Sequence, residues 1–270
     1  MVDRSVSTLD ATGEALLSRH EAWWQRQGML YAEPPVKPLG RLWLPLTDGT
    51  VATEDLDLTP DQVDIDHIVG EHLPNGPVET VGDQFRRSAP YTQIPWVEAI
   101  LGLPICTTIE GGSMRVRAHI SDWSTWESGK VRRNEEWFDL LKRLVSLLAE
   151  RRGGRHAITQ TLMRGPSDLA EAVLGPELMC FSMYDHPNRL HRFLEQATEL
   201  FIEILHEQLA RIPTIEGGYV CPFGIWSPGT VVRTQCDASA FLSADHYAEW
   251  FMPYDVRICE SVDYSIIHLH

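Results

Sequence analysis

The sequence predicts an α/β fold, either a (β/α) barrel or a doubly wound sheet. From Pro95 onward, short apolar segments of strand length alternate with amphipathic segments of helical length. The helical segments are long enough to serve as the crossovers that parallel strands require. No GxGxxG motif follows a predicted strand and no GxxxxGK[ST] motif occurs, which disfavours the nucleotide-binding versions of these folds.

The chain is predicted to form one domain, in which an irregular segment over 1–94 leads into a barrel portion over 95–270. Thr59 is a good helix cap and Pro60 suits the first helical position, so a short helix is expected after them. In order, the predicted elements of the first segment are a helix over 12–28, a Pro-rich connector over 32–40, a strand over 41–46 and a helix over 59–73.

The barrel portion contains two strong helix predictions, over 134–152 and 186–212. The first has acidic residues in its first turn and basic residues in its last, which suits the helix dipole. A third helix, over 243–262, has Ser243 as its cap and a kink at Pro253. The other predicted elements are strands over 103–110, 114–120, 156–165, 217–221, 229–236 and 263–270, and a short helix over 167–175.

Composition excludes several classes of protein. The formal net charge of -15 leaves no cationic surplus for nucleic acid or for an anionic membrane surface. No apolar run is long enough to span a membrane, and the N-terminus lacks the apolar core of a secretory signal. The five cysteines form no CxxC pair, which is typical of reduced thiols. A cytoplasmic protein acting on a small-molecule substrate is therefore predicted.

Polar residues follow several predicted strands, where a barrel assembles its chemistry. Asp237 is expected to orient a substrate or to act as a general acid or base, and Glu110 is a second catalytic candidate. Capping and surface roles are the alternatives for these two carboxylates. Arg164 ends a strand and Arg233 lies within one. Both guanidinium groups are candidates for binding substrate carboxylates, which arginine grips through two parallel hydrogen bonds.

Two aromatic residues near the same edge are candidates for an apolar wall. Phe223 and Trp226 lie in a Gly- and Pro-rich loop between the strands predicted over 217–221 and 229–236. Such a loop at a barrel mouth can contact a flat ligand. The same Gly and Pro content also describes an ordinary tight turn.

The last strand carries two histidines, His268 and His270. Alternation along a strand places residues i and i+2 on the same face, so both imidazoles can reach one metal ion. Nitrogen ligands suit Zn²⁺, but a catalytic zinc usually takes three protein ligands. The pair is therefore an incomplete zinc site, or two strand-end histidines that make ordinary hydrogen bonds.

Several segments together resemble the uroporphyrinogen decarboxylase superfamily, which also contains zinc-dependent corrinoid:coenzyme M methyltransferases. They are IPWVEAILGLPI, MRGPSDLAEAVLGPEL, DHPNRLHRFLEQATEL, WSPGTVVRTQCDASAFLSADHYAEWFMPY and IIHLH, and they cover about 95–270. The resemblance implies a TIM (β/α)8-type barrel. Because the sequence holds too few predicted strands to close one, the chain is expected to be incomplete at its C-terminus.

The two branches of the superfamily imply different reactions. The decarboxylases bind their substrate carboxylates with arginines, several from an RQAGR motif, which WWQRQG here does not match. The methyltransferases bind zinc through a strand-end His-x-Cys and a downstream Cys. His268 matches that His, and His270 stands in place of the Cys.

The resemblance therefore favours zinc-assisted methyl transfer from a corrinoid or methylated substrate to a thiol. A corrinoid protein would then be a partner, and homodimerisation is left open. One alternative is cofactor-free decarboxylation of uroporphyrinogen or a similar polycarboxylate in porphyrin biosynthesis. Asp237 or Glu110 would then stabilise the developing pyrrolic cation. Another alternative is an inactive fragment.

Overall fold

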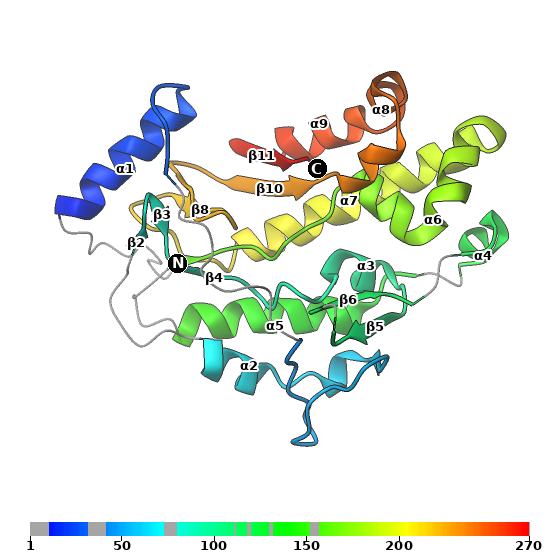
Figure 1. Cartoon of the computed structure of the whole chain (residues 1–270), viewed down its shortest axis with the longest axis horizontal. Coiled ribbons are helices and arrows are strands. Elements are labelled where there is room, and N and C mark those ends of the chain that lie inside the picture. The colour runs from blue at the N-terminus through cyan, green and yellow to red at the C-terminus, as the bar shows by residue number, and fades with distance from the viewer. Residues whose placement is uncertain are drawn as a thin grey trace.

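The computed structural model describes residues 11–31, 42–72, 80–110, 112–117, 120–129, 132–151 and 157–269. Within these ranges helices and short strands combine into an α/β fold. Strands β10 and β11 and helix α9 lie on one side of the molecule, helices α2 and α5 lie on the opposite side, and α7 runs between them (Figure 1). His270, one of the predicted metal ligands, lies outside the described residues.

Four parallel strands position the chemically interesting residues. They are β4 (Arg87–Ser88), β7 (Ala157–Ile158), β10 (Val231–Gln235) and β11 (Tyr264–His268). β4 pairs with β7 and β10 pairs with β11, both in parallel. The helical segments between the strands of each pair provide the crossovers that parallel pairing needs, as the sequence predicts.

The chain that follows β7 runs beside β10. The Gln160 side-chain amide, oriented to satisfy both neighbours, donates to the Val231 carbonyl (3.1 Å) and accepts from the Arg233 N–H (2.8 Å). Farther along, the Gly165 N–H donates to the Gln235 carbonyl (2.7 Å). The chain that leaves the β4–β7 pair therefore lies alongside the β10–β11 pair.

The segments predicted as strands over 103–110 and 114–120 do not belong to this parallel set. They form β5 (Ile105–Thr108) and β6 (Ser113–Val116), an antiparallel hairpin with β1 (Asp57–Leu58) on its other edge. Residues 109–112 are too short a connection for a parallel crossover, so antiparallel pairing is forced. Two smaller antiparallel pairs are β2 (Thr80–Val81) with β3 (Gln84–Phe85), and β8 (Tyr219–Val220) with β9 (Trp226–Ser227).

The two long helices form where the sequence predicts them. α5 (Glu135–Arg151) buries Leu141 and Leu144 completely, and α7 (Pro187–Leu209) does the same with Phe193 and Phe201. Their apolar residues recur at helical spacing, so each helix presents one hydrophobic face to a common core. Burial of that core is the main driving force for this part of the fold.

Two other helices differ from the prediction because of proline positions. α6 (Pro166–Asp185) continues beyond the predicted end, since Gly175 takes a left-handed φ of 73° and Pro176 starts a second helical stretch directly after it. The helix predicted over 243–262 is two helices, α8 (Ala244–Trp250) and α9 (Met252–Glu260). Pro253 lies in the first turn of α9, where it costs no hydrogen bond, and therefore begins a helix rather than kinking one.

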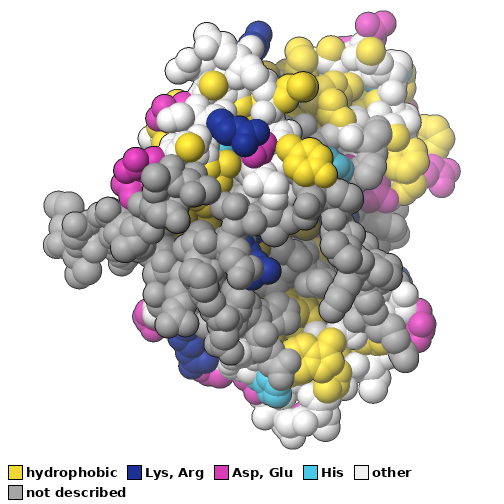
Figure 2. Space-filling view, turned by 60° about the vertical axis from the view of Figure 1, so that its left-hand side comes forward, with side chains coloured by type: hydrophobic (Ala, Val, Ile, Leu, Met, Phe, Trp, Pro, Cys, Tyr) yellow, Lys and Arg dark blue, Asp and Glu magenta, His cyan; other side chains and the backbone are white. Residues whose placement is uncertain are grey.

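The remaining helical elements are α1 (Ala11–Trp24), η1 (Pro60–Gln62), α2 (Ile65–His72), α3 (Trp96–Leu101), α4 (Trp123–Glu127) and η2 (Asp237–Phe241). No helix in the described part of the chain has both the length and the apolar composition needed to cross a membrane. Figure 2 shows hydrophobic, acidic and basic side chains of described residues on one face of the molecule.

Candidate active site

Five side chains on and beside β10 and β11 form a connected group, which we call the β10–β11 cluster. They are Phe223 from the connection between β8 and β9, Arg233 and Gln235 of β10, Asp237 of η2 and His268 of β11. Arg233 Nη1 donates to Gln235 Oε1 (2.7 Å), and the Gln235 amide donates to Asp237 Oδ2. Asp237 Oδ1 lies 3.7 Å from His268 Nδ1. That distance suits an ion pair when the imidazole is protonated and is too long for a hydrogen bond.

Local structure explains why these residues meet. Arg233 and Gln235 are two apart on β10, so their side chains leave the same face of the strand. The parallel register sets Gln235 opposite His268, and the Cys236 N–H donates to the His268 carbonyl (3.1 Å). The chain then turns into η2, whose first residue is Asp237. Side-chain alternation along β10 therefore explains why Arg233 and Gln235 share a face, and the parallel register explains why His268 of β11 lies next to them.

Arg233 is unusual because it is only 4% exposed. Its guanidinium carbon lies 4.9 Å from the centre of the Phe223 ring, which stabilises the cation through the ring face. The Phe223 ring is also 6.0 Å from the His268 ring. Burial lowers the pKa of Arg233, and the neighbouring Asp237 acts in the opposite direction. The cluster thus places a buried cation behind an aromatic ring and beside the Asp237–His268 pair.

Arg164 lies near the cluster and pairs with a buried carboxylate. Its Nε is 2.7 Å from Oε1 of Glu98, whose side chain is 2% exposed, whereas that of Arg164 is 34% exposed. The charge of Glu98 raises the pKa of Arg164, and Asp168 and Asp237 raise it further. Glu98 falls on α3, where sequence alone favours a surface role. Its burial against Arg164 is a tertiary effect that helix periodicity does not reveal.

Two buried carboxylates near Asp237 are not evident from the sequence. Asp168 of α6 is 3% exposed, and burial raises its pKa to about 7. Asp255 of α9 is 1% exposed, and burial raises its pKa to about 6. Desolvation penalises the charged form of a carboxyl group, which is the cause in both cases. The local sequence offers one hint for Asp168, which lies in the first turn of a helix after Gly165-Pro166. An exposed acid that stabilises the helix dipole occupies the same kind of position, so the hint does not reveal the burial.

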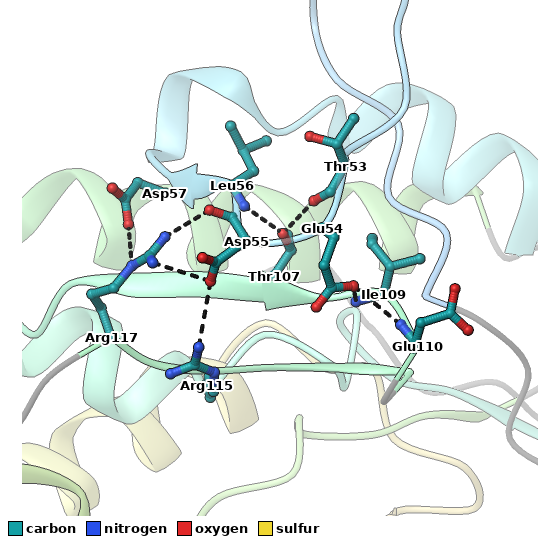
Figure 3. Close-up of polar contacts among 10 residues, drawn as sticks. All are labelled: Thr53, Glu54, Asp55, Leu56, Asp57, Thr107, Ile109, Glu110, Arg115 and Arg117. Carbon is teal, nitrogen blue, oxygen red and sulfur yellow. Dashed lines mark hydrogen bonds and ion pairs between the residues drawn. The ribbon is translucent and has the colours of Figure 1, made fainter.

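The structure does not bring Glu110 to this group. Glu110 lies at the turn after β5, where its backbone N–H donates to Oε2 of Glu54 (3.2 Å), and its side chain is exposed (Figure 3). Nearby, Arg117 pairs with Asp55 (3.0 Å) and Asp57 (2.7 Å). This hairpin lies well away from β10 and β11 (Figure 1). The contacts of Glu110 and its neighbours attach the segment before α2 to the hairpin.

Trp226 also lies apart from the β10–β11 cluster. It is 3% exposed within a second hydrophobic cluster that includes Leu16, Phe85 and Val220. Its indole N–H donates to the Ile215 carbonyl (2.8 Å). Of the two predicted aromatic wall residues, the structure therefore places Phe223 beside Arg233 and His268. Trp226 instead packs against residues of α1 and β8.

Zinc requires a donor set that the described residues do not complete. Among residues 11–269 with the gaps given above, no group of three His, Cys, Asp or Glu side chains is arranged to hold a metal ion. His268 and Asp237 provide two donor groups at the carboxyl end of the β10–β11 pair. A catalytic zinc needs about three, and His270 lies outside the described residues. The zinc site stays a prediction.

Gly165 allows the close approach between the chain after β7 and β10. A Cβ at this position would lie 2.7 Å from the Gln235 carbonyl oxygen and 3.0 Å from Asp255 Oδ1. We expect Gly165→Ala to lower the free energy of unfolding by about 2 kcal/mol through overpacking, as measured by urea denaturation. Gly70→Ala is the matched control, because no atom lies within 4 Å of the added carbon and alanine favours a helix. Equal stability of the two variants would contradict the close approach.

Comparisons with known proteins add one structural likeness. No protein-family model matches the sequence, and no curated protein matches it. Among solved structures the chain is similar to a methyltransferase from Methanosarcina mazei, with a TM-score of 0.50 and 16% sequence identity. The match covers 68% of this chain and 50% of the methyltransferase, so it spans half the length of that protein. At this level of identity, the likeness shows that the two proteins share an α/β fold.

Proposed function

We propose that this chain is an enzyme of the uroporphyrinogen decarboxylase superfamily that transfers a methyl group from a corrinoid or another methylated substrate to a thiol. The observation that carries the proposal is the Asp237–His268 pair at the carboxyl edge of β10 and β11. The fold likeness to a methyltransferase supports the reaction class. The four parallel strands are consistent with an arc of a (β/α) barrel, whose chemistry collects at this edge.

Methyl transfer to a thiol begins with loss of the thiol proton, because the thiolate is the nucleophile. In the proposed reaction the His268 imidazole accepts that proton, and the Asp237 carboxylate 3.7 Å away stabilises the resulting cation. The sulfur electron pair then forms the bond to the methyl carbon. The bond between that carbon and the donor breaks, and the donor leaves with the bonding electrons.

The other members of the cluster would orient the acceptor. Phe223 presents an aromatic ring beside His268 and covers the Arg233 guanidinium. Nε of Arg233 is buried and has no hydrogen-bond partner among the described residues. An acidic group on the acceptor would satisfy that N–H and compensate the buried charge. Arg164 is less suited to this task because Glu98 already neutralises it.

The proposal is tested by incubating the purified chain with methylcobalamin and 2-mercaptoethanesulfonate. Thioether formation is measured by mass spectrometry, and loss of the methyl donor by its visible absorbance. We expect His268→Ala and Asp237→Asn each to lower the rate by about 100-fold or more, the usual contribution of a positioned general base. His67→Ala is the control, since α2 lies on the opposite side of the molecule from β11 (Figure 1).

Three results would overturn the proposal. One is thioether formation no faster than in a blank without protein. Another is a rate that His268→Ala and Asp237→Asn leave unchanged. The third is release of carbon dioxide from a porphyrinogen by the wild-type chain, because decarboxylation would then replace methyl transfer as the reaction of this site.

A further inference from the structure

The turn that carries Phe223 is closed by hydrogen bonds within itself. Residues 221–225, which we call the Phe223 turn, connect β8 to β9. The Cys221 N–H donates to the Ile225 carbonyl (2.9 Å), and the Gly224 N–H donates to the Cys221 carbonyl (2.8 Å). Gly224 takes a left-handed φ of 75°, which glycine adopts without strain. These bonds set the shape of the turn, but they do not set its orientation toward β10 and β11.

The orientation of the Phe223 turn is set by residues 84–87, which belong to β3, β4 and the residue between them. Three successive carbonyls of the turn each accept a hydrogen bond from this segment. The pairs are the Gln84 side-chain amide with the Phe223 carbonyl (2.6 Å), the Phe85 N–H with the Gly224 carbonyl (2.8 Å), and Nε of Arg87 with the Pro222 carbonyl. Because a peptide group is planar, a hydrogen bond to each of three successive carbonyls fixes how the turn lies against β3 and β4.

Gly224 allows the close approach that these hydrogen bonds need. A Cβ at this position would lie 2.8 Å from the Phe85 carbonyl oxygen and 3.0 Å from Cβ of Gln84. Gly217, in the tight turn before β8, has nearly the same φ, 76°, but no atom lies within 4 Å of an added Cβ there. Alanine would therefore strain the backbone equally at both positions and would collide with a neighbouring segment only at position 224.

The Phe223 turn matters because its aromatic ring belongs to the β10–β11 cluster. The centre of the Phe223 ring lies 4.9 Å from the guanidinium carbon of Arg233 and 6.0 Å from the His268 ring. A rotation of the turn against β3 and β4 would carry the ring away from both side chains. The place of the ring in the cluster therefore depends on donors that lie far earlier in the sequence.

We propose that Gln84 and Arg87 are positioning residues, which hold the Phe223 ring against the β10–β11 cluster and through it set the affinity for the acceptor thiol. The effect on the thiol rests on the proposed function, in which Phe223 orients the acceptor. The hold on the Phe223 turn does not depend on the reaction. Gln84 is half-buried and Arg87 is exposed, so each hydrogen bond alone contributes modestly and the two are best removed together.

The hold is tested by hydrogen exchange of the peptide covering 219–227, measured by mass spectrometry. Gln84→Met/Arg87→Met removes both side-chain donors and keeps side chains of similar length. We expect protection of this peptide to fall about tenfold or more in the double variant, the effect of two lost hydrogen bonds. Arg143→Met, at an exposed position of α5 on the opposite side of the molecule from β10 (Figure 1), should keep the protection of the wild type.

The effect on the thiol is tested by the kinetics of methyl transfer at varied thiol concentration. We expect the double variant to raise KM for the thiol about tenfold, the equivalent of one lost aromatic contact. Its kcat should stay within about twofold of the wild type, because His268 and Asp237 are unchanged. Gln84→Met/Arg87→Lys restores a donor for the Pro222 carbonyl and should recover part of the lost affinity.

The two glycines provide an independent test from the side of the turn. Gly224→Ala should raise KM as the double variant does, whereas Gly217→Ala, with the same backbone strain, should leave KM at the wild-type value. An equal KM in these two variants, or a double variant that lowers kcat without raising KM, would reduce the contacts to a purely structural role and overturn the inference.

The hydrogen-exchange result separates this inference from the proposed function. Unchanged protection of the 219–227 peptide in the double variant would overturn the inference even if methyl transfer is confirmed. Loss of protection in a chain whose wild type transfers no methyl group would leave the hold on the Phe223 turn intact and remove the proposed function instead.

Discussion

Replacing Arg164 by methionine is expected to lower the free energy of unfolding by about 3 kcal/mol. The cost arises because Glu98, with a side chain only 2% exposed, loses the cation that lies 2.7 Å from its Oε1. An uncompensated buried carboxylate must either stay charged in a poor solvent or take up a proton, and both alternatives destabilise the folded state. Urea denaturation at about pH 7, followed by tryptophan fluorescence, measures the loss.

Replacing the other partner of this ion pair, Glu98, should lower the free energy of unfolding much less. Glu98→Gln leaves Arg164 without its partner, but the Arg164 side chain is 34% exposed and can be solvated. We expect a loss of about 1 kcal/mol, and we expect the double variant Arg164→Met/Glu98→Gln to be more stable than Arg164→Met alone. Arg115→Met is the control, because its partner Asp55 is itself exposed (58%) and surface pairs contribute little. Equal losses for the two single variants would contradict this account.

The same ion pair illustrates what sequence can and cannot predict in this chain. The helices α5 and α7 are predictable because their apolar residues recur at helical spacing over many turns. β10 and β11 are predictable as strands from their apolar and β-branched residues, and the prediction that Arg233 lies within a strand is confirmed. The pairing of Glu98 with Arg164 depends instead on how α3 packs against the chain after β7, which no local pattern encodes.

Connection length and proline position account for the other differences. The strands over 103–110 and 114–120 have the composition expected of sheet strands, but their short connection makes them an antiparallel hairpin and takes Glu110 away from β10. Pro176 and Pro253 start helical stretches, although proline within a helical pattern usually signals a break or kink. Asp168 and Asp255 escape prediction because a helical acid is usually solvated, and their burial follows from tertiary packing.

Stability should depend on pH through these two buried acids. A carboxyl group whose pKa is higher in the folded chain than in the unfolded one stabilises the fold fully at pH values below the unfolded pKa, about 3.9 for Asp. That contribution is lost as the pH rises through the folded pKa, about 7 for Asp168 and about 6 for Asp255. For Asp168 the loss between about pH 4 and pH 8 is on the order of 4 kcal/mol.

Asp168→Asn isolates this effect, since asparagine keeps an oxygen for the Ala238 N–H and does not ionise. Urea denaturation across this pH range should show the variant gaining stability relative to the wild type by roughly that amount as the pH rises. Asp263→Asn is a control of opposite sign: hydrogen bonds from Thr230 lower the pKa of Asp263. That variant should lose stability relative to the wild type as the pH rises through the acidic range. If the stability difference between Asp168→Asn and the wild type stayed the same at every pH, Asp168 would have to ionise as readily in the folded chain as in water. Burial at α6 would then not control its charge.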